Sequence, residues 1–132
     1  MDSSGYEREL RVRLSEAGFL VTRAGGSLGI DLLAVCGRSV HPILPIEVKS
    51  SHNPVHHTSH NSGRETEQYN RSIAECRRAG VRDVLVAYRL VGRARNGWRI
   101  FDRPTRTTPK GHYVFEWEKG VPLDEYLRKL LL

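Results

Sequence analysis

Residues 5–17 alternate apolar and polar positions with the period of an amphipathic α-helix. Ser3 or Ser4 can cap the amino end of this helix, and Gly18 can adopt the left-handed conformation that ends it. We therefore expect a helix that packs one face on the rest of the fold. That face carries four apolar side chains at intervals of three or four residues: Tyr6, Leu10, Leu14 and Ala17.

Runs of branched and aromatic side chains then predict a series of short β-strands. Pro42 and Pro45 stand at the start of one of them and indicate an irregular start or an exposed edge, because proline cannot donate a backbone hydrogen bond. The pair Asn96-Gly97 favours a tight hairpin turn. The expected strands cover residues 19–22, 30–35, 43–50, 84–88 and 98–101, and residues 113–117 can add a sixth.

Two further helices are expected, one over residues 64–79 and one from Pro122 onward. Residues 51–63 hold hardly any apolar side chain, so we expect a flexible polar loop there. This order of elements predicts an α/β fold, in which helices flank a central mixed sheet of five or six strands. The last helix has an apolar face that can pack on the sheet or join two chains: Leu123, Tyr126, Leu127, Leu130 and Leu131.

The chain has 132 residues, which suits one domain and is too short for two, so we expect a single domain over residues 1–132. No apolar run approaches the roughly 18 residues that a membrane helix needs, and the polar start is unlike a secretory signal. We therefore expect a cytoplasmic protein with no membrane partner. Cys36 and Cys76 lack the spacing of a disulfide framework or a zinc ribbon, which favours reduced, packed thiols.

The 21 Lys and Arg residues exceed the 15 Asp and Glu residues by six, and the excess is concentrated in one segment. Residues 89–110 hold seven basic side chains against a single acid, Asp102, so the rest of the chain is neutral. The segment is either a solvated loop and strand edge or a polyanion-binding surface, because clustered guanidinium groups bind phosphates and displace their counterions. Its basic residues are Arg89, Arg93, Arg95, Arg99, Arg103, Arg106 and Lys110.

Glu47 and Lys49 lie two residues apart on one expected strand, so they share a face, with roughly 7 Å between their side-chain origins. Asp31 stands within an apolar strand, where a carboxylate is costly unless it is paired or bound to a metal. If the two strands are neighbours, Asp31 and Glu47 converge and repel each other unless a cation bridges them, and Mg²⁺ or Mn²⁺ suits such ligands. Alternatively, Asp31 caps a turn or pairs with Arg23, and an isolated Glu-x-Lys is common by chance.

The order of these motifs resembles that of the archaeal-type Holliday junction resolvases, which are members of the PD-(D/E)XK nuclease superfamily. The resemblance is close over residues 6–50, extends through Gly97-Trp98-Arg99, and is weak in residues 51–63 and after Phe101. It implies a restriction-endonuclease-like fold and metal-dependent hydrolysis of DNA. The matching runs are Tyr6-Glu7-Arg8-Glu9-Leu10, Gly18-Phe19, Arg23-Ala24-Gly25-Gly26-Ser27, Ile30-Asp31-Leu32-Leu33-Ala34 and Ile46-Glu47-Val48-Lys49.

The resemblance also implies a role for each residue of the two strand motifs. Asp31 and Glu47 correspond to the metal-binding carboxylates, and the carbonyl of Ile46 or Val48 corresponds to a further oxygen ligand. Lys49 corresponds to the residue that orients the attacking water or stabilises charge on the phosphate. The implied cofactor is Mg²⁺, for which Mn²⁺ can substitute.

Glu7 corresponds to the helix acid of the family, which helps to complete the metal site, and we count it as catalytic. Helix geometry agrees, because Glu7 falls about 60° from the centre of the apolar face and Glu9 about 100°. Arg8, Arg23 and Ser27 stand where the family holds phosphate-contacting residues. Ser27 lies on a glycine turn that permits close backbone approach, and we count it as catalytic too. In the basic segment, we expect DNA contacts from Arg93, Arg95 and Arg99.

These features together predict a homodimeric, Mg²⁺-dependent endonuclease that resolves a four-way DNA junction by two symmetric nicks. One alternative is another nuclease of the superfamily that cuts branched or duplex DNA, and a second is a DNA-binding module without activity. The helix at 64–79 has few apolar side chains, so the position of the dimer contact is left open. The histidines in residues 51–63 can be interpreted as zinc ligands, but a polar loop beside the site more naturally touches DNA.

Overall fold

The computed structural model describes residues 3–25, 29–93 and 97–131 of the chain. The principal element within this part is a sheet of six strands in the order β1-β2-β3-β5-β6-β9. β3 and β5 run parallel and the other neighbouring strands run antiparallel, so the sheet is mixed, which confirms the prediction. Its strands are β1 (Leu20–Arg23), β2 (Leu32–Val35), β3 (Ile43–Ser51), β5 (Leu85–Leu90), β6 (Trp98–Phe101) and β9 (Val121–Pro122).

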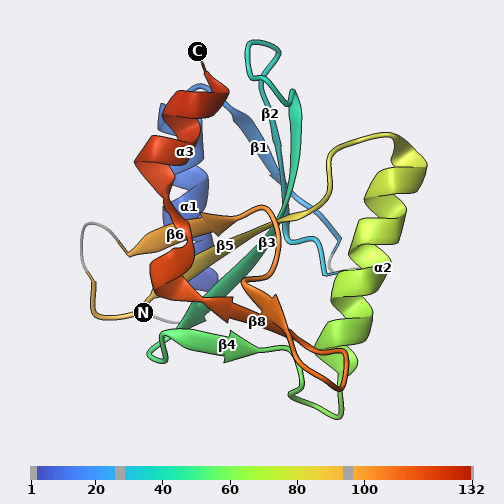
Figure 1. Ribbon diagram of the computed structural model, residues 1–132. Helices are drawn as coiled ribbons and strands as arrows, with labels where there is room; N and C mark the ends of the chain where they lie inside the picture. Colours follow the sequence, from blue (N-terminus) through green and yellow to red (C-terminus); the bar gives the residue numbers. More distant parts are fainter. Residues whose placement is uncertain (1–2, 26–28, 94–96, 132) are drawn as a thin grey trace.

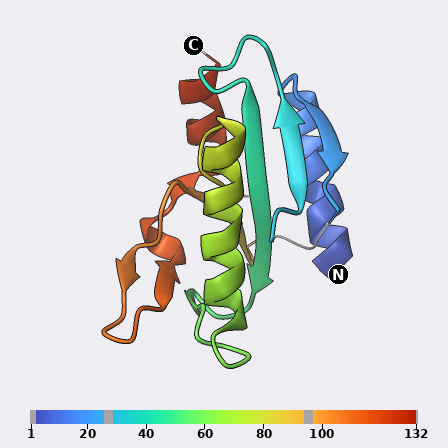
Figure 2. The ribbon, with the colours of Figure 1, turned by 90° about the vertical axis from the view of Figure 1, so that its right-hand side faces the viewer.

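Helices cover both faces of this sheet (Figures 1 and 2). α1 (Ser3–Glu16) and α3 (Leu123–Leu130) lie on one side, and α2 (Arg64–Ala79) lies on the other. α2 ends where the sequence predicted, because Gly80 takes up a left-handed conformation with φ of 74° and its N–H reaches back to the last turn. The predicted α/β architecture is confirmed. None of the helices in the described ranges is long and apolar enough to span a membrane.

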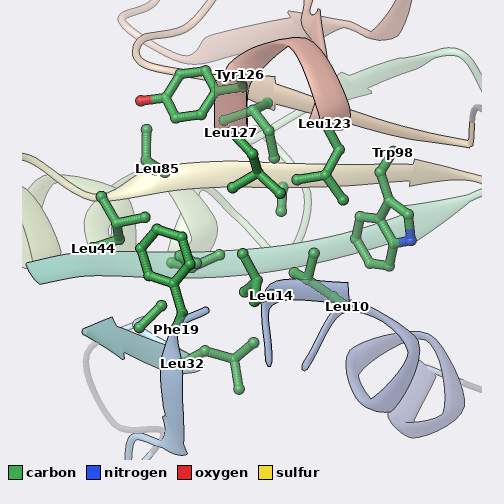
Figure 3. Packing of buried hydrophobic residues seen from close by; sticks show 14 of the residues in the cluster. Leu10, Leu14, Phe19, Leu32, Leu44, Leu85, Trp98, Leu123, Tyr126 and Leu127 are labelled. Atoms are coloured by element: carbon green, nitrogen blue, oxygen red, sulfur yellow. The ribbon is translucent and has the colours of Figure 1, made fainter. Parts of the chain in front are cut away.

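The larger core lies between the sheet and the pair α1 and α3 (Figure 3). Leu10 and Leu14 of α1 and Leu127 of α3 point toward the sheet, which contributes Leu44 and Leu85 to the same cluster. Burial of side chains of this size stabilises the fold by about 1.5 to 3 kcal/mol each. The apolar face of α3 therefore packs on the sheet, and four of its members are buried: Leu123, Tyr126, Leu127 and Leu130.

A second, smaller core holds α2 against the opposite face of the sheet. Tyr69 of α2 packs with Val86 and Tyr88 of β5 in this core. Successive side chains of a strand point to opposite faces, so Leu85 and Ala87 belong to the larger core instead. β5 is thus buried on both faces, which explains why its residues 85–88 form a continuous apolar run rather than an alternating one.

The predicted loop at residues 51–63 is wrong in part, because β3 continues to Ser51 and a further strand follows. This strand, β4, needs no apolar run of its own, since backbone hydrogen bonds to a distant strand hold it. The strand predicted at 113–117 is its partner, whereas the sixth strand of the main sheet is β9. The resulting small sheet consists of β4 (Val55–His57), β8 (Tyr113–Glu116) and β7 (Arg106–Thr107).

β3 changes its neighbours along its length, and this change positions the functional site. Residues 43–46 pair with β2, whereas residues 46–51 pair with β5. Pro45 lies in the part of β3 that has β2 but not β5 beside it, so its missing N–H removes no ladder hydrogen bond to β5. This arrangement agrees with the edge position that the prolines indicated. Asp31 stands at the point where β2 and β3 separate.

Candidate active site

Asp31 lies immediately before β2, and backbone atoms of β3 hold it on both sides. Its N–H donates to the Ile46 carbonyl at 2.8 Å, and its Oδ2 accepts a hydrogen bond from the Val48 N–H at 2.6 Å. The carboxylate therefore replaces the backbone acceptor that β2 no longer supplies to β3. Burial raises the pKa of Asp31, although the Val48 hydrogen bond and the Lys49 charge act in the opposite direction.

Glu47 and Lys49 project from β3 on the face opposite to that of Ile46 and Val48, as alternation along a strand requires. Glu47 is only 7% exposed, and its Oε1 lies 3.2 Å from the Lys49 Nζ. Burial raises the pKa of Glu47, the Lys49 charge lowers it, and the charge of Asp31 raises it again. Two neighbouring carboxylates therefore keep raised pKa values, a situation that a bound cation would relieve.

A cavity of about 420 Å³ opens beside Asp31 and Lys49. α1 contributes Glu7 to its wall and β1 contributes Arg23, whose Nε lies 3.0 Å from the Glu7 Oε1. The structure thus brings three predicted catalytic residues, from three separate parts of the chain, to one cavity. The described residues that line it are Ser4, Glu7, Arg23, Asp31, Val48, Lys49 and Ser50, so Glu47 lies outside its wall.

The two acids of α1 have different surroundings. Glu7 lines the cavity, which agrees with the inward position expected from helix geometry. Glu9 instead accepts hydrogen bonds at its Oε1 from the Arg89 Nε at 2.9 Å and from the Trp98 Nε1 at 2.6 Å. Trp98 is 2% exposed, so Glu9 belongs to the polar lining of the larger core.

Glu65, which no sequence pattern singled out, and His56, one of the histidines considered above as zinc ligands or DNA contacts, complete the cluster around Lys49. Glu65, in the first turn of α2, has its Oε2 3.4 Å from the Lys49 Nζ and 2.6 Å from the Nε2 of His56 on β4. The His56 hydrogen bond, with the Lys49 charge, outweighs burial and lowers the pKa of Glu65 to about 2. Acids are common in the first turn of a helix because they complement its dipole, so Glu65 carried no distinguishing signal.

The residues predicted to contact phosphates near the glycine turn are exposed where the structure describes them. Arg8 is exposed on α1, next to Glu7 in sequence. The side chain of Arg23 is 67% exposed at the cavity. Ser27 and Arg95 lie outside the described residues.

The basic segment at residues 89–110 is not a uniform surface. Arg89 is only 6% exposed and its guanidinium is engaged by Glu9. The Arg99 guanidinium donates to the Gly120 carbonyl at 3.0 Å and lies 4.5 Å from a ring centre of Trp117, whereas Arg93 is exposed. Part of the positive charge that the sequence concentrates here therefore supports the fold.

The oxygen atoms around the cavity are of the kind that a divalent cation prefers, but few side chains supply them. Across residues 3–25, 29–93 and 97–131, no three His, Cys, Asp or Glu side chains are grouped as a metal site. Asp31 and Glu47 nevertheless offer hard carboxylate oxygens, the ligands that Mg²⁺ and Mn²⁺ prefer. Their raised pKa values show that the protein groups around them leave their negative charge incompletely compensated.

Comparison with known proteins connects this site to one family. A family model for the archaeal Holliday junction resolvase (Hjc) matches residues 2–131, which include the whole site. A comparison with curated proteins found no match. Among solved structures, the chain is similar to Hjc, a Holliday junction resolvase from the archaeal hyperthermophile Archaeoglobus fulgidus, with a TM-score of 0.73 and 25% identity over 98% of each chain. The chain therefore belongs to the archaeal Holliday junction resolvase family and is a junction-resolving nuclease.

Proposed function

We propose that this nuclease hydrolyses two phosphodiester bonds of a four-way DNA junction at a site built from Glu7, Asp31, Glu47 and Lys49. The observation that carries the proposal is the shared cavity, in which Asp31, Glu7 and Lys49 meet beside the exposed Arg23. Asp31, Glu47 and Glu7 would hold a divalent cation, Mg²⁺ or in its place Mn²⁺. Such a cation supplies positive charge for the phosphate and makes water a better nucleophile.

The backbone of β3 offers a further oxygen on the Asp31 side of the site. The N–H and C=O groups of one strand residue point toward the same side of the strand. The Val48 N–H bonds the Asp31 carboxylate, so the Val48 carbonyl also points toward Asp31. The Ile46 carbonyl already accepts the Asp31 N–H. Of the two carbonyls that the resemblance left open, the geometry favours that of Val48.

Lys49 supplies a fixed positive charge at the cavity. Burial alone would lower its pKa, but the charges of Glu47 and Glu65 and their hydrogen bonds raise it above its ordinary value. Its ammonium therefore stays protonated at neutral pH. A charge that is already in place where negative charge develops on the phosphate lowers the barrier without reorganisation during the reaction. The same ammonium can donate a hydrogen bond that orients the attacking water.

The exposed arginines would bind the DNA backbone around this cavity. Arg23 stands at the cavity and can reach a phosphate bidentately, and Arg8 lies on the neighbouring helix. Arg93 is one of the exposed residues of the basic segment. We extend the same role to the other predicted residues, Ser27, Arg95 and Arg99. A homodimer would place two such sites in two-fold symmetry, which matches two symmetric nicks in a junction. The cytoplasmic location stays a prediction.

The proposal is tested by separating junction binding from junction cleavage. We expect Asp31→Asn and Lys49→Ala to lower single-turnover cleavage of a four-way junction in Mg²⁺ by at least about a hundredfold. Asp31 would help to hold the cation, and Lys49 supplies positive charge at the reacting phosphate. Gel-shift affinity for the junction should persist in both variants. Lys49→Ala has a matched control in Lys129→Ala, which removes an exposed lysine of α3 and should leave both measurements unchanged.

A loss of binding together with cleavage in both variants would contradict these roles. The same assay on a matched duplex and a splayed arm decides the substrate. Equal cutting of all three substrates would replace the junction by DNA in general. No cutting in Mg²⁺ or Mn²⁺ would indicate a DNA-binding module.

A further inference from the structure

The Lys49 ammonium lies between two carboxylates, one from its own strand and one from α2. Its Nζ is 3.2 Å from the Glu47 Oε1 and 3.4 Å from the Glu65 Oε2. A lysine side chain has four flexible methylene groups, so its ammonium is placed only as well as its partners place it. Glu65 thus provides a second anchor for Lys49, in addition to Glu47, which would also hold the cation.

Glu65 is itself held by His56. The His56 Nε2 lies 2.6 Å from the Glu65 Oε2, and both side chains are less than a fifth exposed. Glu65 is ionised at neutral pH, so its oxygen accepts and the histidine ring must donate. The His56 ring packs edge-on against Tyr88, which pairs with Lys49 in the ladder between β3 and β5. The ring is therefore fixed by the strand that lies beside Lys49.

The first turn of α2, which carries Glu65, is fastened to the small sheet by a buried polar network. The Thr66 Oγ1 lies 2.6 Å from the Thr58 Oγ1, 3.0 Å from the Thr58 carbonyl and 2.7 Å from the His112 Nδ1. Thr58 is 3% exposed and Thr66 is 8% exposed. The Tyr113 N–H also donates to the Thr58 Oγ1 at 2.9 Å. Glu65 therefore sits next to an immobilised residue, on the end of α2 that faces the site.

We infer that Glu65 and His56 are positioning residues for DNA cleavage: His56 fixes the Glu65 carboxylate, and Glu65 holds the Lys49 ammonium in place. Glu65 also offers the ammonium a second anion, so that Lys49 does not bind Glu47 alone and neutralise it. The inference rests on the role proposed for Lys49 and gives the small sheet a part in the reaction. Neither residue needs to touch the DNA for this role.

The first test compares two acids of the same helix. Glu65→Gln should slow single-turnover junction cleavage by about 10-fold to 100-fold, the usual effect of losing a residue that orients a catalytic group. Junction affinity should stay unchanged at a temperature well below melting. Glu67→Gln, two residues further along α2 and exposed, is the matched control and should cleave at the full rate.

His56 should act only through Glu65. His56→Ala should slow cleavage, and His56→Gln, which keeps an N–H donor, should restore part of the rate. In the Glu65→Gln background, His56→Ala should have no further effect, because non-additivity is expected of residues that act in series. His52→Gln changes an exposed histidine of the same segment and should have no effect.

A second readout needs neither DNA nor metal. The chain contains four lysines, Lys49, Lys110, Lys119 and Lys129, so isotope-labelled lysine gives a simple NMR spectrum. The side-chain signal of Lys49, identified by its loss in Lys49→Ala, should shift in Glu65→Gln and in His56→Ala. Glu67→Gln should leave it in place.

An unchanged Lys49 signal and full cleavage in Glu65→Gln would overturn the inference. So would an equal loss of binding and cleavage, which indicates a structural role. If Lys49→Ala cleaves normally, the proposed role of Lys49 fails instead. If Lys49→Ala is inactive and Glu65→Gln is fully active, only the positioning role fails.

Discussion

Two carboxylates of α1, Glu7 and Glu9, each form an ion pair with an arginine. The two pairs have the same chemical groups but differ in the exposure of the arginine. Glu7 lies 3.0 Å from Arg23 and Glu9 lies 2.9 Å from Arg89, measured from the carboxylate Oε1 to the Nε. The side chain of Arg23 is 67% exposed, whereas that of Arg89 is 7% exposed. The difference lies in the arginines, because both carboxylates are partly exposed, Glu7 at 17% and Glu9 at 29%. The Arg23 guanidinium is accessible to other partners, whereas the Arg89 guanidinium is enclosed by the core.

The Arg89 guanidinium is buried and has several partners besides Glu9. The Arg89 Nη1 donates to the carbonyls of Leu90 and Arg93, both at 2.7 Å, and the guanidinium lies over the Tyr6 ring. Glu9 also accepts from the indole of Trp98. The pair at the cavity has no such enclosure, and exposed pairs contribute about 0 to 1 kcal/mol. In the proposed function, a DNA phosphate would replace Glu7 beside Arg23 and leave Glu7 available to the site.

The largest expected effect is a loss of stability when the ion pair between Glu9 and Arg89 is broken. Glu9→Ala should lower the free energy of unfolding by about 3 kcal/mol, because Arg89 stays buried with its charge uncompensated. Urea denaturation measures this change. Glu16→Ala, which removes an exposed acid from the same helix, is the control and should change stability by less than about 0.5 kcal/mol. A loss below about 1 kcal/mol for Glu9→Ala would show that Arg89 can reach water.

The next effect appears in activity rather than stability. Glu7→Gln should change the free energy of unfolding by less than about 0.5 kcal/mol, because its partner Arg23 is exposed. Cleavage of a four-way junction in Mg²⁺ should fall by about 10-fold to 100-fold, as expected for a lost metal-site residue. Denaturation and single-turnover cleavage on the same preparation give both values. A variant that is destabilised yet fully active would reverse the contrast between Glu7 and Glu9.

The smallest effect concerns the stability cost of the site itself. Burial raises the pKa of Asp31 above its ordinary value of 3.8, and the Glu7 charge adds to the rise. Between 3.8 and the raised pKa, the folded state binds more protons than the unfolded state, so stability falls as pH rises through this window. At neutral pH, the ionised Asp31 therefore opposes folding.

Asp31→Asn should consequently be slightly more stable than the parent at neutral pH, by about 0.5 to 1 kcal/mol, although we expect it to have lost activity. The difference should shrink as pH falls below the raised pKa, where the parent carboxyl is protonated. Thermal melting of both proteins across this pH range measures the difference. A variant that is less stable at neutral pH would mean that the Val48 hydrogen bond outweighs burial.

Most of the main sheet could be predicted because its signals are local. β6 and α2 have the bounds expected from their apolar patterns and turn glycines. Asp31 stood out as an acid within an apolar strand, but that prediction was wrong by one residue, because β2 begins at Leu32. The small sheet could not be predicted, because β4 is short, polar and held by backbone pairing with a strand more than fifty residues away. The positions of Glu65 and His56 depend on that sheet, so no local sequence pattern predicts their contacts around Lys49.

The sequence by itself determined the three helices and the first five strands of the main sheet, the alternation that puts Glu47 and Lys49 on one face of β3, and the family. The sequence also favoured Glu7 over Glu9 as the acid of the site, but only the tertiary structure decided that Glu9 binds Arg89 and Trp98. The physical reason is that a side chain's use depends on its burial and on partners distant in sequence. Arg89 counted toward the positive segment, yet a carboxylate eighty residues away places it in the core.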